Sequence, residues 1–314
     1  MSTNVTIIVI AFNEERRIRP CLEALIHQDT DIVYEVVVVD DGSSDNTAAL
    51  VSELSTHDPR IHLIRHDHNR GRGAARSTGQ AYASTPLIGF VDADIIVPPS
   101  WLERCVAALG DADAVSGVAV PDGDCAVVWR IARATVRPRP GSAEITGNNV
   151  LFRATTLAKA PYDATSRLGE DFRQAKTMVR QGLLPVTIPD LHVEHRETKT
   201  YPKAARWMFQ QGRDATALLV EFRVIRLPDV AWLSWLLGTL TVALATALGE
   251  LSFVASLSGF VALTSAITVL FTGARFRATP HPLRWCRAAL LNWPLITLYM
   301  LGRSAGAFTG LRSV

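Results

Sequence analysis

Glu35-Val36-Val37-Val38-Val39-Asp40-Asp41-Gly42-Ser43-Ser44-Asp45 is the stretch that decides the fold of this 314-residue chain. Its valine run lacks polar alternation, which predicts a strand buried on both faces, as in a parallel sheet. The Gly-Ser-Ser segment predicts a turn, and Asp45 is expected to cap the helix that follows. Asp40 and Asp41 therefore fall at the end of a buried strand, where α/β sheets bind their ligands.

The rest of the first half repeats this alternation of apolar runs and helical patterns. Residues 5–11, 61–65 and 87–91 are predicted strands, while residues 14–26 and 73–83 are predicted helices. Such alternation predicts an α/β domain with a Rossmann-like, mostly parallel sheet. Five polar side chains fall at or just beyond strand ends, and we expect them at one edge of the sheet. They are Asn13, Asp40, Asp41, Asp92 and Asp94.

A pair of carboxylates follows the predicted strand 87–91 directly. In Asp92-Ala93-Asp94 the two acids are two residues apart, so on extended backbone both side chains point the same way. Neighbouring carboxylates repel each other unless a cation or a proton intervenes. A Mg²⁺ or Mn²⁺ ion held by one or two carboxylates and substrate phosphates fits this spacing, and two solvated loop acids are the alternative.

A glycine-containing loop and an acidic helix start complete the set of motifs. Asn69-Arg70-Gly71-Arg72-Gly73-Ala74-Ala75-Arg76 resembles a phosphate-binding loop but lacks the Gly-Lys-Ser/Thr ending of a P-loop. Its arginines can pair with a diphosphate or a base carbonyl, or they are surface charges. Gly169-Glu170-Asp171 opens a predicted helix at 170–181, where acidic residues are expected from the helix dipole alone.

Long uncharged segments appear only in the last third of the chain. Residues 230–248 and 251–271 carry no charge and are each long enough to cross a hydrocarbon core of roughly 30 Å. Residues 288–302 form a shorter third candidate, and a buried hairpin of a soluble protein is the alternative for the first two. Arginines precede the first segment, at 206–226, and follow the second, at 275–287. The positive-inside rule then predicts a multi-pass protein of the cell membrane with its N-terminal part in the cytoplasm.

These observations divide the chain into a predicted α/β domain, 1–225, and a predicted membrane domain, 226–314. The formal net charge of +2 provides no argument for a nucleic-acid partner. The cysteines are widely spaced and contain no CxxC pair, which argues against a disulfide framework or a zinc site. They are Cys21, Cys105, Cys125 and Cys286.

Taken in order, six motifs resemble family 2 of the inverting glycosyltransferases, which have a GT-A fold. The resemblance covers residues 5 to about 215 and implies transfer of a sugar from a nucleotide-diphosphate donor, for which we expect a UDP-sugar. The predicted membrane spans favour a lipid-linked or glycan acceptor at the cytoplasmic membrane face, with membrane lipids as further partners. The motifs are Ala11-Phe12-Asn13-Glu14-Glu15, Val39-Asp40-Asp41-Gly42-Ser43, Asn69 through Arg76, Asp92-Ala93-Asp94, Gly147-Asn148-Asn149 and Gly169-Glu170-Asp171.

The resemblance also implies a role for each matching residue. Asp171 is the expected general base, which takes a proton from the acceptor hydroxyl as it attacks the anomeric carbon. Asp94, with Asp92, is expected to hold Mg²⁺ or Mn²⁺ on the diphosphate. His195 either faces this metal and diphosphate or is a structural histidine. The expected nucleotide-binding residues are Ala11, Asn13, Glu14, Asp40, Asp41, Arg76 and Asp92, and those near the acceptor or diphosphate are Asn148, Glu170, Gln210 and Arg213.

Two departures from the family narrow the prediction. Processive synthases carry Gln-x-x-Arg-Trp, whereas Gln210-Gln211-Gly212-Arg213 is followed here by Asp214, which favours transfer of a single sugar. Polyprenyl-phosphate sugar synthases continue their DxD motif with Leu-Gln, whereas Ile95-Ile96 follows here, so this activity is kept as an alternative. A sugar-phosphate nucleotidyltransferase and an inactive membrane scaffold are the remaining alternatives. The first would need an N-terminal glycine-rich loop, and the second is disfavoured by the presence of both Asp94 and Asp171.

Overall fold

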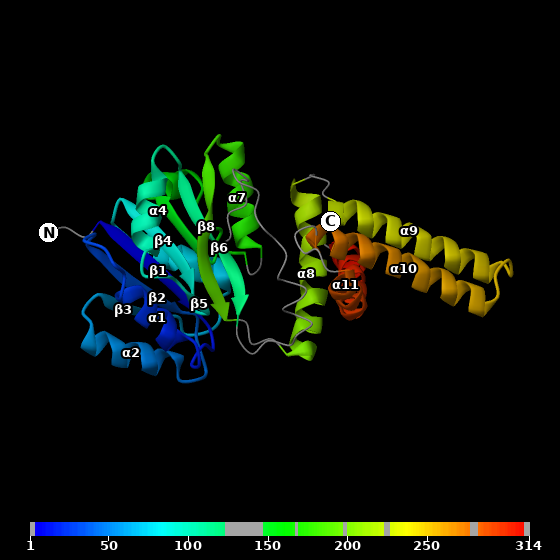
Figure 1. Ribbon diagram of the computed structural model, residues 1–314, viewed down its shortest axis with the longest axis horizontal. Helices are drawn as coiled ribbons and strands as arrows, with labels where there is room; N and C mark the ends of the chain where they lie inside the picture. Colours follow the sequence, from blue (N-terminus) through cyan, green and yellow to red (C-terminus); the bar gives the residue numbers. More distant parts are fainter. Residues whose placement is uncertain are drawn as a thin grey trace. The chain divides into compact units, whose positions relative to one another are not determined.

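The computed structural model describes residues 4–122, 147–166, 169–196, 200–222, 227–276 and 282–310 (Figure 1). These residues form two compact units, one with the described residues up to 196 and one with those from 200 onward. The first unit is an α/β domain of the expected class. Its strands are β1 (Val5–Ala11), β2 (Tyr34–Asp40), β3 (Ile61–Arg65), β4 (Leu87–Asp92), β5 (Ile95–Ile96), β6 (Ala114–Asp122), β7 (Asn149–Arg153) and β8 (Pro185–Arg196).

The eight strands form one sheet in the order β3-β2-β1-β4-β7-β6-β8-β5. The first four run parallel, as the repeated strand–helix pattern predicts. The other half is mixed, because β7 pairs antiparallel with both β4 and β6, and β5 pairs antiparallel with β8. β5 starts within three residues of β4, which is too short a connection for a parallel crossover.

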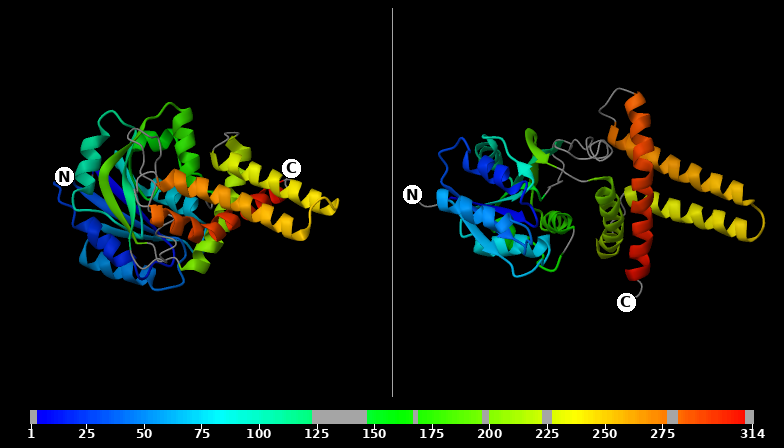
Figure 2. Two further views of the ribbon diagram at one scale, coloured as in Figure 1. Left: turned by 45° about the vertical axis from the view of Figure 1, so that its right-hand side comes forward. Right: turned by 90° about the horizontal axis from the view of Figure 1, so that it is seen from below.

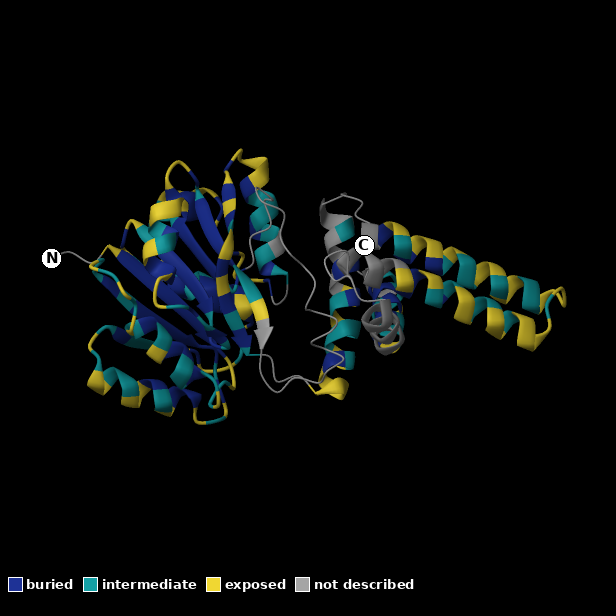
Figure 3. Ribbon diagram, in the orientation of Figure 1, coloured by how far each residue is buried: buried dark blue, intermediate teal, exposed yellow. Residues whose placement is uncertain are grey.

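Helices cover both faces of the sheet, which explains the unbroken valine run. All seven residues of β1 are buried, and Val36 to Val39 of β2 have no exposed surface (Figure 3). Successive residues of β1 belong to different cores, with Val9 in one and Ile10 in the other. The helices are α1 (Ile18–Ile26), α2 (Thr47–His57), α3 (Arg72–Tyr82), α4 (Trp101–Leu109), α6 (Ala154–Lys159) and α7 (Glu170–Arg180).

Two helix starts differ from the expected ones for local reasons. α1 begins at Ile18 rather than at residue 14, because Asn13 has a φ of +57° and the Glu14 N–H donates to the Thr47 hydroxyl at 2.8 Å. α2 begins at Thr47, whose N–H donates to the carboxylate of Asp45 at 3.0 Å. Asp45 thus supports the helix start from two residues upstream.

The second unit is helical and contains α8 (Tyr201–Phe222), α9 (Leu227–Ala247), α10 (Phe253–Phe276) and α11 (Pro282–Gly310). α9 and α10 lie side by side as an antiparallel pair (Figure 2) and are joined at the expected turn, where Gly249 has a φ of +76°. Within the described residues, the segment Asp229–Ala247 is long and apolar enough to cross a membrane, whereas the apolar part of α10, Phe253–Val269, is shorter. The expected third segment lies inside α11. Multi-pass insertion therefore stays a prediction.

α8 and α11 approach each other through glycines. A Cβ on Gly302 would lie 2.0 Å from the carbonyl oxygen of Phe209, and a Cβ on Gly212 would lie 2.0 Å from that of Tyr299. Both distances are far below van der Waals contact, so the two helices need glycine at these positions. Beside this contact, Arg303 of α11 forms a buried ion pair with Asp229 of α9 at 2.5 Å.

We expect Gly302→Ala to destabilise the protein by about 1–3 kcal/mol, because the methyl group forces α8 away from α11. Gly259→Ala in α10 is the matched control, since its Cβ would meet only Val242, at 3.6 Å. That change should be neutral or stabilising by up to about 1 kcal/mol from helix propensity. Thermal unfolding midpoints in detergent measure both changes. Equal midpoints for the two variants would contradict this account of the helix contact.

Candidate active site

The loops after β1 and β2 hold each other in place. The N–H of Asn13 donates to the Ser43 hydroxyl, and the N–H of Ser44 donates to the Asn13 side-chain oxygen, each at 2.9 Å. Asp40 is fully buried beneath this junction, where it accepts the Ser43 N–H at 3.2 Å and lies 3.1 Å from the guanidinium of Arg65. Exposed Asn13 and buried Asp40 therefore hold these two loops together at the edge of the sheet.

Asp41 anchors the loop that precedes α3. Its carboxylate accepts the backbone N–H groups of Arg70 at 2.9 Å and Gly71 at 2.8 Å. Buried His66 adds a contact at 2.7 Å through Nδ1 and reaches the Thr78 hydroxyl at 2.9 Å through Nε2. The motif analysis did not identify His66, although its position just after β3 matches that of the other polar strand-end residues.

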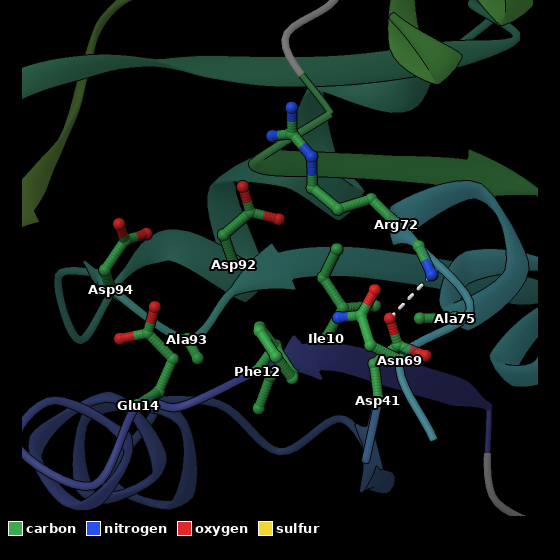
Figure 4. Close-up of a pocket in the computed structure, with 12 residues that line it drawn as sticks. Ile10, Phe12, Glu14, Asp41, Asn69, Arg72, Ala75, Asp92, Ala93 and Asp94 are labelled. Carbon is green, nitrogen blue, oxygen red and sulfur yellow. Dashed lines mark hydrogen bonds between the residues drawn. The ribbon is translucent and has the colours of Figure 1, made fainter. Parts of the chain in front are cut away.

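A cavity of about 320 Å³ opens at the carboxyl edge of the parallel strands (Figure 4). Glu14 and Asp94 lie at one end of it, Asp41 and Asn69 at the other, and Asp92 lies between them. The edge thus brings together strand-end residues that the sequence predicts to be neighbours. The lining residues are Ile10, Ala11, Phe12, Glu14, Asp41, Asn69, Gly71, Arg72, Ala75, Asp92, Ala93 and Asp94.

Crowded negative charge dominates one end of the cavity. Burial raises the pKa of Asp92 from 3.8 to about 6, a shift that Arg76 opposes and Asp94 increases. Burial likewise raises the pKa of Glu14 from 4.5 to about 7, against the effect of Arg17 and with that of Asp94. The energy cost of charging these groups would fall if a cation came between them.

His195 lies beside Asp94 on β8, the strand next to the edge strand β5. The short strand β5 pairs with β8, with Ile95 opposite His195. This pairing brings His195 Nε2 to 3.2 Å from the carboxylate of Asp94. Asp92, Asp94 and His195 could contribute oxygen and nitrogen ligands to one ion, although in their present positions no three acidic, histidine or cysteine side chains of the described residues are grouped closely enough to enclose one.

Arg76 lies behind Asp92 and is absent from the cavity lining. Only 1% of it is exposed, and its Nη2 donates to Asp92 and to the carbonyl oxygen of Gly147, both at 2.7 Å. Its Nη1 donates to Glu170, which is also buried. In this conformation Arg76 does not line the cavity in which the nucleotide is expected.

Asp171 is half-buried in the first turn of α7, beside the chain segment at Gly147. A Cβ on Gly147 would lie 3.0 Å from the Asp171 Cβ. The carbonyl oxygen of the next residue, Asn148, accepts the Asp92 N–H at 3.1 Å. The 147–148 segment therefore lies between Asp92 and Asp171. Gln210 and Arg213 belong to α8 in the second unit, so their roles stay predictions.

The two glycines of the 69–76 loop serve different purposes. Gly71 has a φ of +98° and lines the cavity, as expected for a loop that approaches a ligand. A Cβ on Gly73 would instead lie 2.3 Å from the carbonyl oxygens of both Asp163 and Ser166. Gly73 is therefore required by packing between chain segments, which the motif alone does not reveal.

Comparison with known protein families and solved structures places the sequence and the fold of this chain. The profile of Glycosyl transferase family 2 matches residues 6–164, about half of the chain. The chain belongs to this family. A solved structure of mannosyltransferase PcManGT from Pyrobaculum calidifontis, in complex with GDP-Man and Mn²⁺, has a TM-score of 0.61 at 20% identity, covering 96% of this chain and 86% of that one. This likeness confirms the GT-A fold.

Curated relatives match shorter stretches. Succinoglycan biosynthesis protein ExoO of Rhizobium meliloti is 36% identical over 156 residues, covering 48% of this chain and 44% of that protein. Dolichyl-phosphate beta-glucosyltransferase ALG5D of Trichomonas vaginalis is 40% identical over 97 residues, covering 29% of this chain and 30% of that protein. The chain thus matches less than half of the length of these relatives.

The raised pKa values predict how stability depends on pH. In the folded chain Glu14 and Asp92 keep their protons up to about pH 7 and 6, whereas the unfolded chain releases them near 4.5 and 3.8. The folded chain therefore binds more protons in this window, and the free energy of unfolding must fall as pH rises through it. For Glu14, whose pKa rises from 4.5 to about 7, the loss is about 3 kcal/mol.

Thermal unfolding with chelator present should accordingly give a lower midpoint at pH 8 than at pH 5. Glu14→Gln should reduce this difference, because it removes one of the two groups. Glu53→Gln is the control, since Glu53 is an exposed acid on α2 and its replacement should leave the pH profile as it is. If the unfolding midpoint of Glu14→Gln changed with pH as strongly as that of the wild type, the raised pKa of Glu14 would be contradicted.

Proposed function

We propose that the chain is a metal-dependent, inverting glycosyltransferase that transfers one sugar from a nucleoside-diphosphate donor to a lipid-linked or glycan acceptor. The observation that carries this proposal is the cavity at the carboxyl edge, where Asp92 and Asp94 lie at a strand end beside Glu14. A diphosphate with its cation has the charge and oxygen chemistry to fill such a site. The family membership supports the same reaction class.

The nucleoside is proposed to bind at the other end of the cavity, over Ala11, Asp41 and Asn69. Asp41 Oδ2 accepts one N–H, from Gly71, and so has room for a second donor, which a base N–H or a ribose hydroxyl can supply. We propose a uridine diphosphate donor. PcManGT was solved with GDP-Man. If this chain used a guanosine diphosphate sugar as its donor, the proposal of uridine would be wrong.

The carboxylates of Asp92 and Asp94 would hold the metal, with His195 beside Asp94. Their chemistry fits the ion, because each offers oxygen ligands and the two together need a counter-charge. Bound Mg²⁺ or Mn²⁺ supplies charge neutralisation for the departing nucleoside diphosphate. PcManGT, solved with Mn²⁺, supports this assignment.

Asp171 is the proposed base. It would accept the acceptor's proton while the new glycosidic bond forms and the bond to the diphosphate breaks on the opposite side, which inverts the anomeric centre. A polyprenyl phosphate is a second candidate acceptor, supported by the identity to dolichyl-phosphate beta-glucosyltransferase ALG5D. Attack by a phosphate oxygen would need little help from a base, so the effect of removing Asp171 separates the two acceptor classes.

We further propose that α9 and α10 anchor the protein in a membrane with the α/β unit on the cytoplasmic side. Asp229–Ala247 has the required length, and several large apolar side chains of both helices are exposed. They include Leu237, Leu240, Leu244, Phe253 and Val254. Lipid would cover these side chains, and an anchored enzyme would meet lipid-linked acceptors at the membrane surface.

Replacing a proposed metal ligand tests whether the site binds a divalent cation. Asp94→Asn keeps the size of the side chain but removes a charged ligand, so Mn²⁺ affinity in the presence of UDP should fall at least about tenfold. Electron paramagnetic resonance of free Mn²⁺ measures this without an activity assay. Asp67→Asn, at an exposed acid, should change nothing. EDTA should stop sugar transfer by the wild type, and full transfer in chelator would remove the metal from the proposal.

Replacement of Asp171 tests the reaction itself. Nucleotide sugars are supplied to the purified protein with membrane lipid extract, and products are identified by mass spectrometry. Asp171→Asn should lose turnover by about 10²–10⁴-fold, because it loses the basic oxygen, while UDP affinity by calorimetry should be unchanged. Exposed Asp190, replaced by Asn, is the control. Near-normal turnover in Asp171→Asn would exclude it as the base and favour a phosphate acceptor.

A further inference from the structure

One buried guanidinium joins the two sides of the proposed reaction. Arg76, on α3, donates through Nη2 to Asp92 at the end of β4 and through Nη1 to Glu170 at the start of α7. Glu170 is 94 residues from Arg76 in sequence and immediately precedes Asp171. The same Nη2 also donates to the carbonyl oxygen of Gly147 at 2.7 Å. Four separate chain segments therefore meet at Arg76.

The surroundings make this contact hard to replace. Arg76 and Glu170 are each 1% exposed, and the guanidinium lies 5.4 Å from the ring centroid of Tyr162. Burial alone would lower the pKa of Arg76, but the carboxylates of Asp92 and Glu170 outweigh it and raise the pKa. Glu170 Oε2 is buried without a hydrogen-bond partner among the described residues, and the shortest ion pair that compensates the charge of Glu170 is with Arg76.

Space around the contact is equally restricted. A Cβ on Gly147 would lie 3.0 Å from Arg76 Nη2 and 3.0 Å from the Cβ of Asp171. Arg72 adds a second cation to Glu170, with its Nε at 3.6 Å from the carboxylate. The first turn of α7 is thus held by charge and by close packing against the segment of Gly147 and Asn148.

We propose that Arg76 and Glu170 are positioning residues that set the location of Asp171 relative to Asp92, and that neither binds the nucleotide or the acceptor. The inference rests on the proposed function. Asp92 is on the donor and metal side, Asp171 is on the acceptor side, and Arg76 is bonded to Asp92 and to the residue next to Asp171. A displacement of about 1 Å in such a pair can cost about 10²-fold in rate.

Glu170→Gln is the sharper probe, because it alters the α7 side of the contact and leaves the bond from Arg76 to Asp92 in place. We expect kcat to fall about 10–100-fold, with KM for the donor and UDP affinity within twofold of the wild type. Arg76→Lys keeps the charge but loses the two-sided contact and should lower kcat similarly. The double variant should be little worse than either single variant, because both remove the same contact.

The exposed ion pair of Arg104 and Asp190, at 2.7 Å, provides a matched control. Arg104→Lys, Asp190→Asn and their combination should leave kcat and KM unchanged. Thermal midpoints show whether each variant is folded. If Arg76→Lys fails to fold, Glu170→Gln alone still decides the question through its kcat and KM.

The inference is overturned if Glu170→Gln keeps wild-type kcat, or if Arg76→Lys weakens UDP binding while Glu170→Gln does not. The second result would make Arg76 a nucleotide ligand. Both results are distinct from failure of the proposed function, in which the wild type itself transfers no sugar from any nucleotide donor. Strongly additive losses in the double variant would also overturn the inference, because they would show that the two residues act separately.

Discussion

Negative charge gathered at the carboxyl edge of β1, β2 and β4 is the constraint on which the site depends. Asp41, Asp92, Asp94 and Glu14 line one cavity of about 320 Å³, and burial makes the ionised forms of Asp92 and Glu14 costly. The fold stabilises some of this charge internally: Asp41 accepts backbone N–H groups, and Asp92 pairs with Arg76. The remaining excess of negative charge would favour a bound cation, such as the one proposed to hold the diphosphate.

This arrangement follows from the parallel half of the sheet. Four parallel strands end at one edge, so polar residues placed after each strand meet there regardless of their separation in sequence. The sequence therefore predicted the class of the fold, the main strands and the neighbourhood of Asp41, Asp92 and Asp94. The valine run of β2 was informative because its neighbours on both sides, β1 and β3, and helices on both faces leave it no contact with water.

What the sequence could not show were contacts that depend on which side chains are buried. Arg76, the last residue of the 69–76 loop, was expected to contact a nucleotide. In the structure it is buried, because it donates hydrogen bonds to Glu170 and to the carbonyl oxygen of Gly147, both far along the chain. The need for glycine at position 73 could not be predicted either, because the carbonyl groups that approach Gly73 belong to Asp163 and Ser166, far along the chain. Burial of a charged residue arises from such long-range packing, which local patterns do not encode.

The helical unit illustrates the same distinction between composition and contact. α9 could be predicted from the sequence because it contains a long uncharged segment. The apolar character of Asp229–Ala247 can be seen without knowing which residues it contacts. The approach of α8 to α11 depends instead on the absence of side chains at Gly212 and Gly302, which leaves almost no trace in composition. Here the buried pair of Arg303 and Asp229 has a counterpart in the α/β unit, where Arg76 pairs with Glu170.

The ion pairs Arg76–Glu170 and Arg303–Asp229 each join helices that are distant in sequence. In each pair the arginine has the longer side chain. A planar guanidinium can bond to groups on two sides at once, which a lysine cannot do with the same geometry. For Arg303 the second contact is with aromatic rings, 4.9 Å from Trp232 and 5.9 Å from Tyr299, so the pair fixes packing. For Arg76 the second contact is a cavity-lining carboxylate, Asp92. Of these two pairs, the Arg76 pair is therefore the one whose geometry can set the position of the proposed reacting groups.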